Sequence, residues 1–275
     1  MRPSLGAAFF VVTACSLAGV LFTAQGEPIR SQPPAEAGNP LPFLVQGEEF
    51  LRPSLRAMQA DDFDNPAFPL VEAAEASWST PAAPGGKCCR DCHGAEDKNL
   101  LKRAAASYPK YAPDLKEVIT LQTRINNCRK NYLGEPALAG SDSRMIGMTA
   151  YLRWLARGSP STVDVTGPNA EAFERGRKLY QTKLGRFQIS CAQCHNEKFG
   201  QKFGADTISQ GHPLAYPAYK SSESRVISLH ERFRMCNKFA RDEGQPDDAP
   251  DYVALELYLG WRSKNLPITA PGVRP

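Results

Sequence analysis

Two pentads of the form Cys-x-x-Cys-His carry the clearest chemistry in this chain. Cys89–His93 and Cys191–His195 lie about a hundred residues apart and hold four of the eight cysteines. Two thiols at this spacing can add across the two vinyl groups of one haem, and the adjacent imidazole then binds the iron. A zinc site would need further Cys or His pairs at short spacing, and none follows. The sequence therefore predicts two covalently attached haem c groups.

The pentads also account for half of the histidines. The predicted haem-attaching thiols are those of Cys89, Cys92, Cys191 and Cys194, and the predicted proximal ligands are His93 and His195. Only His212 and His230 remain. His212 could be a distal ligand, but its place between Gly and Pro favours a surface loop. For His230 we expect a buried, hydrogen-bonded side chain that orients its segment or contacts a haem propionate.

The first residues indicate export from the cytoplasm. Arg2 precedes an uncharged apolar run over residues 5–24, and Ala-Gln-Gly at 24–26 offers a cleavage site, so residues 1–26 are predicted to be a signal peptide. A membrane anchor is an alternative because the run is nearly long enough to span a bilayer. A lipoprotein is another, since residues 12–15 resemble a lipobox ending at Cys15. Each alternative places the mature chain where haem attachment and disulfide-permitting chemistry occur.

Chain length and net charge limit the number of domains and the kinds of partner that this protein can have. About 250 residues follow the signal peptide, enough for one large or two small domains. The formal net charge of +4 is small for 275 residues, so neither nucleic acid nor a membrane surface is indicated as a partner. No glycine pattern typical of a Walker or dinucleotide-binding loop stands out.

The chain repeats itself around the pentads. Helical periodicity precedes each pentad, over residues 65–78 and 169–184, and follows it, over residues 148–155 and 252–259. The fold class expected is mainly α, with two tandem cytochrome c-like domains at residues 61–160 and 161–275. Each would contain a helix before the pentad, an irregular loop carrying the distal ligand and an amphipathic closing helix. The proline-rich residues 27–60 are expected to form an extended arm, or else a disordered tail.

The distal side of each iron has two candidate ligand types. Met145, Met148 and Met235 would give the common histidine–methionine pair. Cys128 and Cys236, however, occupy matching positions of the repeat and are flanked by basic side chains that would stabilise a thiolate. Thiolate ligation would lower the reduction potential. From these residues alone, buried free thiols or a disulfide between the two cysteines remain equally open.

Several short motifs then point to one family. They are Asp-Asn-Pro at 64–66, Gly-Lys at 86–87, Leu-His-Glu-Arg-Phe at 229–233, Leu-Glu-Leu-Tyr-Leu at 255–259 and Pro-Gly-Val-Arg at 271–274. Together with the pentads they resemble the A subunit of the SoxAX cytochrome, which acts in periplasmic thiosulfate oxidation. The resemblance extends through most of the chain after the signal peptide.

The resemblance implies ligands and roles. Each iron would be held by histidine and cysteine, His93 with Cys128 and His195 with Cys236. Cys236 would be the catalytic nucleophile, modified to a persulfide, and Arg232 would contact substrate. The implied activity is that of an L-cysteine S-thiosulfotransferase, which couples thiosulfate oxidatively to a cysteine of the carrier SoxYZ. Electrons would leave through the small haem subunit SoxX, bound as a heterodimer.

The residues around Cys236 suit this chemistry. Thiosulfate is a dianion, and Arg232, Arg234, Lys238 and Arg241 offer positive charge, although a solvated basic helix face would look the same. Because this segment is richer in arginine than that of Cys128, we expect Cys236 to be indispensable and Cys128 to be structural or tuning. A thiosulfate dehydrogenase that forms tetrathionate and a plain electron carrier are the alternative functions.

Overall fold

The computed structural model describes residues 33–94 and 98–275, so the predicted signal peptide and the first residues of the arm lie outside the described part. The helices are α1 (Pro53–Ala60), α2 (Phe68–Trp78), α3 (Cys89–His93), α4 (Lys98–Ala106), α5 (Leu121–Cys128), α6 (Ser143–Leu155), α7 (Ala170–Gln181), α8 (Cys191–His195), α9 (Leu229–Phe239) and α10 (Pro250–Arg262). Short helical turns are η1 (Gly47–Phe50), the π-helical η2 (Arg129–Leu133), η3 (Gly167–Asn169) and η4 (Ser221–Glu223). The strands are β1 (Lys110–Ala112), β2 (Glu117–Ile119), β3 (Lys202–Phe203), β4 (Asp206–Thr207), β5 (Ala218–Lys220), β6 (Arg225–Ile227) and β7 (Gly272–Arg274).

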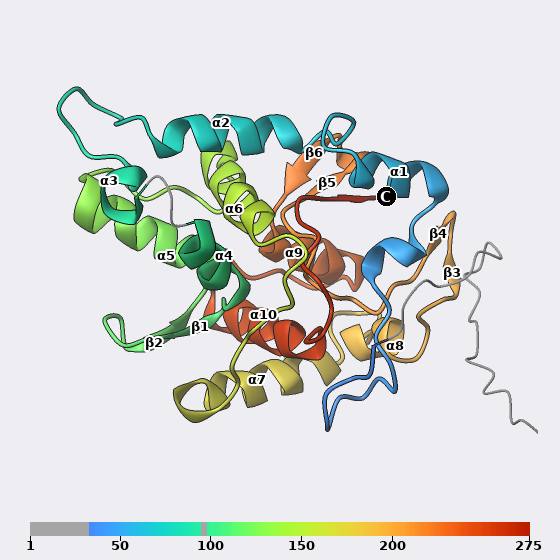
Figure 1. Cartoon of the computed structure of the whole chain (residues 1–275). Helices are drawn as coiled ribbons and strands as arrows, with labels where there is room; N and C mark the ends of the chain where they lie inside the picture. The colour runs from blue at the N-terminus through green and yellow to red at the C-terminus, as the bar shows by residue number, and fades with distance from the viewer. Residues whose placement is uncertain (1–32, 95–97) are drawn as a thin grey trace, which may run out of the picture.

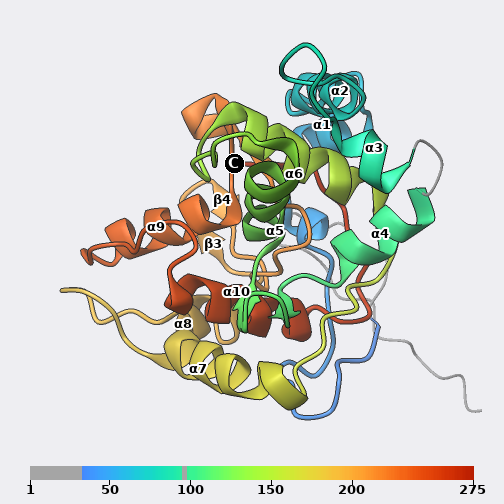
Figure 2. The same ribbon diagram turned by 90° about the vertical axis from the view of Figure 1, so that its left-hand side faces the viewer.

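Two crossed helix pairs confirm the predicted mainly α fold. α2 packs against α6, and α7 packs against α10; the first pair lies in the upper half of Figure 1 and the second in the lower half, as the turned view in Figure 2 also shows. A glycine lies at each crossing. A Cβ at Gly147 would lie 2.8 Å from the carbonyl oxygen of Leu70, and one at Gly176 would collide with that of Ala254. These glycines let the backbones of the paired helices approach closely.

The second closing helix, α10, differs from the amphipathic helix that we expected. Nearly all of its side chains are buried. The reason is that α10 is covered on two sides, by α7 on one and by β2 of the first half on another. We call residues 61–160 and 161–275, with one pentad each, the two haem-motif halves. α10 belongs to the second half and lies where that half meets the first (Figure 1).

A small sheet joins distant parts of the chain. β5 pairs with β6 in antiparallel orientation and with the C-terminal β7 in parallel orientation. α1 packs against β7. The sheet thus brings the arm, the segment before α9 and the last residues together.

The N-terminal arm is not extended over its whole length. Its residues 53–60 form the helix α1, which begins with a proline at the first helical position. The part before it lies along the second half. The Asn39 side chain donates to the Arg262 carbonyl at 3.0 Å, and the Gln46 side chain donates to the Pro267 carbonyl at 3.0 Å. These hydrogen bonds attach the arm to the C-terminal part of the chain.

The main hydrophobic core joins the two halves as well. It includes residues of α2, α4 and α6 together with Leu44 of the arm and Leu266 and Ile268 near the C-terminus. Gly158 N donates to the Ile268 carbonyl at 2.9 Å, close to the boundary expected at residues 158–162. The division into domains at residues 61–160 and 161–275 stays a prediction.

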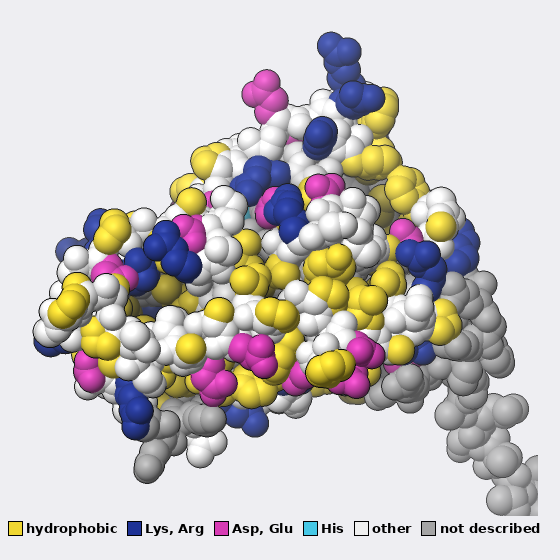
Figure 3. Space-filling model, turned by 90° about the horizontal axis from the view of Figure 1, so that it is seen from above, with side chains coloured by type: hydrophobic (Ala, Val, Ile, Leu, Met, Phe, Trp, Pro, Cys, Tyr) yellow, Lys and Arg dark blue, Asp and Glu magenta, His cyan; other side chains and the backbone are white. Residues whose placement is uncertain are grey.

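The described surface mixes charge and apolar side chains. Seen from above, basic and acidic side chains are interspersed with hydrophobic ones on this face (Figure 3). None of the described helices has both the length and the hydropathy needed to cross a bilayer.

Candidate functional site

The second pentad forms the short helix α8, and its histidine is oriented by the following loop. Ser190 caps α8, with its hydroxyl accepting from Gln193 N at 3.3 Å while the Gln193 side chain accepts from Ser190 N at 2.8 Å. His195 Nδ1 lies 2.7 Å from the carbonyl oxygen of Ser209, to which it donates. The other ring nitrogen, Nε2, is then the free acceptor that a metal can bind.

Burial keeps His195 neutral, and the same loop packs closely against its ring. Burial lowers the pKa of His195 to about 4, although the hydrogen bond to the Ser209 carbonyl works in the opposite direction. The ring is therefore in its metal-binding form at neutral pH. A Cβ at Gly211 would lie 2.8 Å from His195 Cγ, so only glycine fits behind the ring without a shift.

A cavity of about 520 Å³ opens beside this histidine. Its lining includes Cys191, Cys194, His195 and, from α9, Cys236. The apolar part of its wall includes Phe50, Leu179, Tyr180, Phe233, Leu255 and Leu259. Two thiols, a neutral imidazole and a further thiol around an apolar cavity of this size fit a haem c.

The cavity brings together cysteines that are distant in sequence. Burial raises the pKa of Cys191 to about 12 and also raises that of Cys194, and the nearby Cys236 adds to both effects. Cys236 lies within α9, which corrects our expectation of an irregular loop. Ser228 caps this helix by accepting from Glu231 N at 3.1 Å. The Ser-x-x-Glu spacing at 228–231 is a helix-start signal from which this helix could have been predicted.

The first pentad is arranged in a similar way. α3 begins where Asp91 accepts from Cys88 N at 2.8 Å. Burial, with contributions from neighbouring Cys88, Glu135 and Cys128, raises the pKa of Cys89 to about 11. Cys128 is the last residue of α5, so it too lies on a helix rather than in a loop. The structure therefore places Cys128 near the pentad residues of its own half.

The histidine of the first pentad packs against an aromatic side chain. The His93 ring lies 5.7 Å from that of Trp78, centroid to centroid. Both are part of the first half, with Trp78 at the end of α2.

Among residues 33–94 and 98–275, no three His, Cys, Asp or Glu side chains form a cage for a metal ion.

The arginines near Cys128 are neutralised. Arg124 forms an ion pair with Asp114 at 2.7 Å, and Arg129 forms one with Glu135 at 2.6 Å. Their positive charge is therefore balanced by carboxylates of the same half. This segment offers little net charge for an anionic substrate.

The arginines near Cys236 differ from one another. Arg234 is paired with Asp247 at 2.6 Å. Arg232 is half-buried and, within the described residues, has no carboxylate at ion-pair distance. The neighbouring Cys236 and Tyr216 raise the pKa of Arg232. Arg232 and Cys236 lie four residues apart and thus on one face of α9.

The two remaining histidines lie in the interior. His212 is buried, which makes our surface-loop prediction wrong; its Nε2 lies 3.0 Å from Gln210 Oε1. His230 is buried as expected, with Nδ1 accepting from Asp248 N at 3.0 Å and Nε2 lying 3.1 Å from Glu256.

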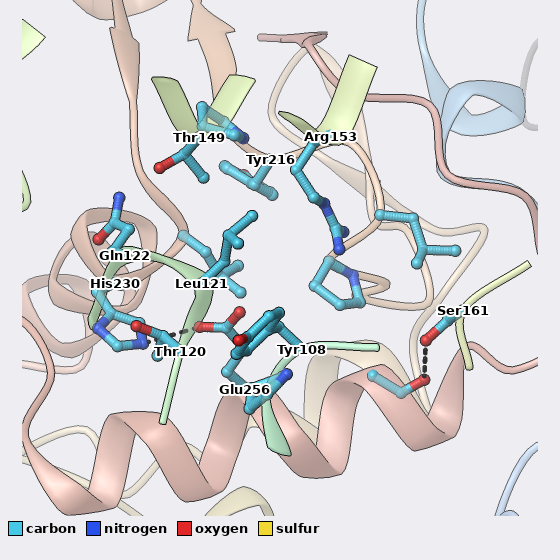
Figure 4. A pocket seen from close by; sticks show the side chains of 16 residues that line it. Tyr108, Thr120, Leu121, Gln122, Thr149, Arg153, Ser161, Tyr216, His230 and Glu256 are labelled. Carbon is cyan, nitrogen blue, oxygen red and sulfur yellow. Dashed lines mark hydrogen bonds and ion pairs between the residues drawn. The ribbon is translucent and has the colours of Figure 1, made fainter. Parts of the chain in front are cut away.

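A second, small cavity is lined by residues of both halves. Figure 4 shows that His230 and Glu256 face Thr120, while Arg153 and Tyr216 lie on the other side. Its volume of about 40 Å³ has room for a few water molecules but not for a haem. This small cavity, with mixed polar and apolar walls, is consequently part of the contact between the halves and no haem site.

Comparison with known proteins decides the family. A family model described as SoxA/TsdA, cytochrome c domain, matches residues 73–161 and 175–268. This chain belongs to the SoxA/TsdA cytochrome c family. The two matched segments contain one pentad each, and the family resemblance seen in the sequence is confirmed. As a cytochrome c family member, the chain binds haem c covalently.

Individual relatives agree with the family. The L-cysteine S-thiosulfotransferase subunit SoxA of Rhodovulum sulfidophilum is 35% identical over 89% of this chain and 85% of that relative. The protein of the same name from Pseudaminobacter salicylatoxidans is 31% identical over 90% and 86%. A crystal structure of SoxXA from P. pantotrophus matches with a TM-score of 0.83 at 26% identity, covering 93% of this chain and 97% of that chain.

Proposed function

We propose that this chain is the dihaem subunit of an L-cysteine S-thiosulfotransferase, which couples thiosulfate oxidatively to a cysteine of a sulfur carrier protein. Relatives of similar length carry this enzyme name. The observation that supports the proposal most strongly is the pairing of Cys236 with Arg232. Both line the cavity of His195, and Arg232 has no carboxylate partner in the described chain.

Two haems are part of the proposal. Cys191 and Cys194 would attach one, with His195 and Cys236 toward its iron. The corresponding residues for the other are Cys89, Cys92, His93 and Cys128. Each bound haem supplies one-electron redox chemistry at a potential that its ligands lower.

The chain's own residues would bind and orient the substrate. Arg232 would hold the sulfonate group of thiosulfate with charge-assisted hydrogen bonds, which places the sulfane sulfur near Cys236. The sulfur of Cys236 would bond to that sulfane sulfur as two electrons leave, and the carrier thiolate would then attack the same sulfane sulfur and displace the Cys236 sulfur. One thiolate and one thiosulfate give one carrier S-thiosulfonate and two electrons, so a carrier thiol would also release one proton.

The electrons need an acceptor, for which we propose a small haem subunit of the SoxX type. The solved relative is a SoxXA complex, and this chain matches nearly all of one of its chains. The carrier would be of the SoxYZ type. A periplasmic location after removal of residues 1–26 completes the proposal, and the cleavage site itself lies outside the described residues.

Exchange of each distal cysteine for methionine tests this proposal. Methionine can still approach the haem but cannot form a thiolate or a persulfide. We expect Cys236→Met to abolish thiosulfate-dependent modification of the carrier cysteine, followed by mass spectrometry, while Cys128→Met retains it. Both variants should keep their covalent haems on a haem-stained gel. Full activity of Cys236→Met would refute the proposal, and tetrathionate as the only product of the wild-type protein would favour a thiosulfate dehydrogenase.

A further inference from the structure

The cavity beside Cys236 has two further cations to which the sequence motifs assigned no role, although Arg274 belongs to the Pro-Gly-Val-Arg motif. Lys220 of β5 and Arg274 of β7 line it together with Arg232 of α9. They come from three elements that are distant in the sequence. Tyr216, just before β5, lines the same cavity.

Lys220 and Arg274 are held side by side by the sheet. They are direct partners in the parallel register of β5 and β7. Side chains of register partners extend from the same face of a sheet, so two positive charges are placed next to each other. Like charges in this position repel, and the arrangement costs stability unless an anion lies between or before them.

The hydrogen-bond partners of Arg274 are neutral, whereas Lys220 is also in close contact with an oxygen of Pro275, the last residue of the sequence. Lys220 Nζ donates to Ser222 Oγ at 2.5 Å and to an oxygen of Pro275. Arg274 Nη1 donates to Gln59 Oε1 at 2.7 Å and to the Val273 carbonyl at 2.6 Å.

Three carboxylates lie near these cations and balance part of their charge, Asp206 and Glu223 near Lys220 and Glu48 near Arg274, but two of them also have other partners. Glu48 accepts from the Gln59 side chain at 2.9 Å, and Asp206 lies 3.5 Å from Arg52. Arg225, which is paired with Lys220 across β5 and β6, is neutralised by Glu231.

The three cations, which line one cavity, also act on one another electrostatically. Burial lowers the pKa of Lys220 and of Arg274, and the charge of Arg232 lowers both further. Burial raises the pKa of Tyr216, so its hydroxyl stays protonated and able to donate. The wall beside Cys236 therefore offers three cations and a neutral hydroxyl.

We propose that Lys220 and Arg274 complete, with Arg232, an oxyanion subsite that binds the sulfonate end of thiosulfate. This inference rests on the proposed function and extends it, because a single arginine would not fix the orientation of a small dianion. Three cations around the sulfonate leave the sulfane sulfur as the end facing Cys236. Neutral sulfur compounds would gain nothing from this subsite. A carboxylate of a haem propionate has related chemistry and is the competing occupant.

Direct binding to the holoprotein tests the subsite without relying on turnover. Thiosulfate is titrated by calorimetry into the wild-type protein, Lys220→Met and Arg274→Lys. Lys238→Met is the matched control, since Lys238 is exposed on α9 and does not line the cavity. We expect Lys220→Met to weaken binding at least about tenfold, Arg274→Lys to weaken it less, and Lys238→Met to bind like the wild type.

The haem spectrum and reduction potentials, measured without thiosulfate, identify the occupant. Under the proposal they are unchanged in Lys220→Met. An unchanged affinity would overturn the subsite, and so would a shifted potential with unchanged affinity, which would assign the cations to a haem propionate. If the wild type binds thiosulfate in the expected way but does not modify the carrier, the subsite stands and the proposed function fails.

Discussion

At the scale of single residues, the two haem-motif halves differ in how their arginines are compensated. Arg124 and Arg129 near Cys128 have carboxylate partners, and so does Arg234 near Cys236. Arg232 alone among these four has none in the described chain. A half-buried charge without a counter-ion is costly, and such groups are typical of sites that bind an anion.

Arg232 and Arg234 form a matched pair for mutation. Arg232→Gln should lower kcat/KM for thiosulfate about 10- to 100-fold, because a charge-assisted hydrogen bond is worth roughly 1.5–3 kcal/mol. Arg234→Gln removes the same charge from a site where Asp247 already balances it, so its effect should be small. Steady-state kinetics of carrier modification compares them, and equal losses in both variants would contradict the assignment of Arg232 to substrate.

At the residue scale, the sequence was most informative where covalent chemistry fixes the spacing. The pentads and the two candidate distal cysteines could be picked out because haem attachment and the repeat restrict their positions, and their roles as haem ligands stay predictions. His212 could not be placed. Its burial depends on Gln210, whose side chain accepts from Val45 N, 165 residues earlier. No local pattern in Gly-His-Pro shows such a contact.

At the scale of elements, the proximal loop and the helices of the site depend on backbone details. The four long helices around the pentads were predictable from their 3.6-residue periodicity. The helices that carry Cys128 and Cys236 were not, although Thr120 and Ser228 are typical N-caps. Polar and basic side chains predominate in both segments and resembled an irregular loop, although Leu121 and Ile125, and likewise Leu229 and Phe233, recur at helical spacing.

Gly211 offers a test of the proximal loop. Both Gly211 and Gly200 have positive φ, at 75° and 82°, but only a Cβ at Gly211 would meet the His195 ring. Either change to alanine should cost about 1 kcal/mol in the free energy of unfolding, from the backbone conformation alone. Only Gly211→Ala should also change the absorption spectrum and potential of the second haem. Redox titration with thermal unfolding measures both, and identical spectra in both variants would argue against close packing behind His195.

At the scale of the whole molecule, the two halves are not independent domains packed side by side, because they share a hydrophobic core. α10 is buried between them, and the main core takes residues from the arm and the C-terminal segment. Gln210, with no exposed surface, connects the arm to the loop that holds His195. These long-range contacts explain why the repeat predicted the units but not how they share a core.

Gln210→Leu tests this connection. The change leaves Val45 N, the Phe43 carbonyl and the His212 ring without their partner. Unpaired buried polar groups cost about 1–3 kcal/mol each, so we expect a loss of about 2–4 kcal/mol in the free energy of unfolding, after partial relaxation. The control is Gln46→Leu, whose bond to the Pro267 carbonyl is exposed and should contribute less than about 1 kcal/mol. Equal stability of the two variants in chemical unfolding would show that Gln210 does not join arm and loop.

The most direct test of the account is the mass of the mature protein, followed by peptide mapping around Cys236. We predict two covalent haems, one on each pentad, and a Cys236 peptide that carries one extra sulfur atom while the Cys128 peptide does not. A single haem would contradict the prediction of two haem groups. A Cys236 that stays unmodified in the presence of thiosulfate would contradict sulfur transfer at this cysteine and leave a protein that only carries electrons or forms tetrathionate.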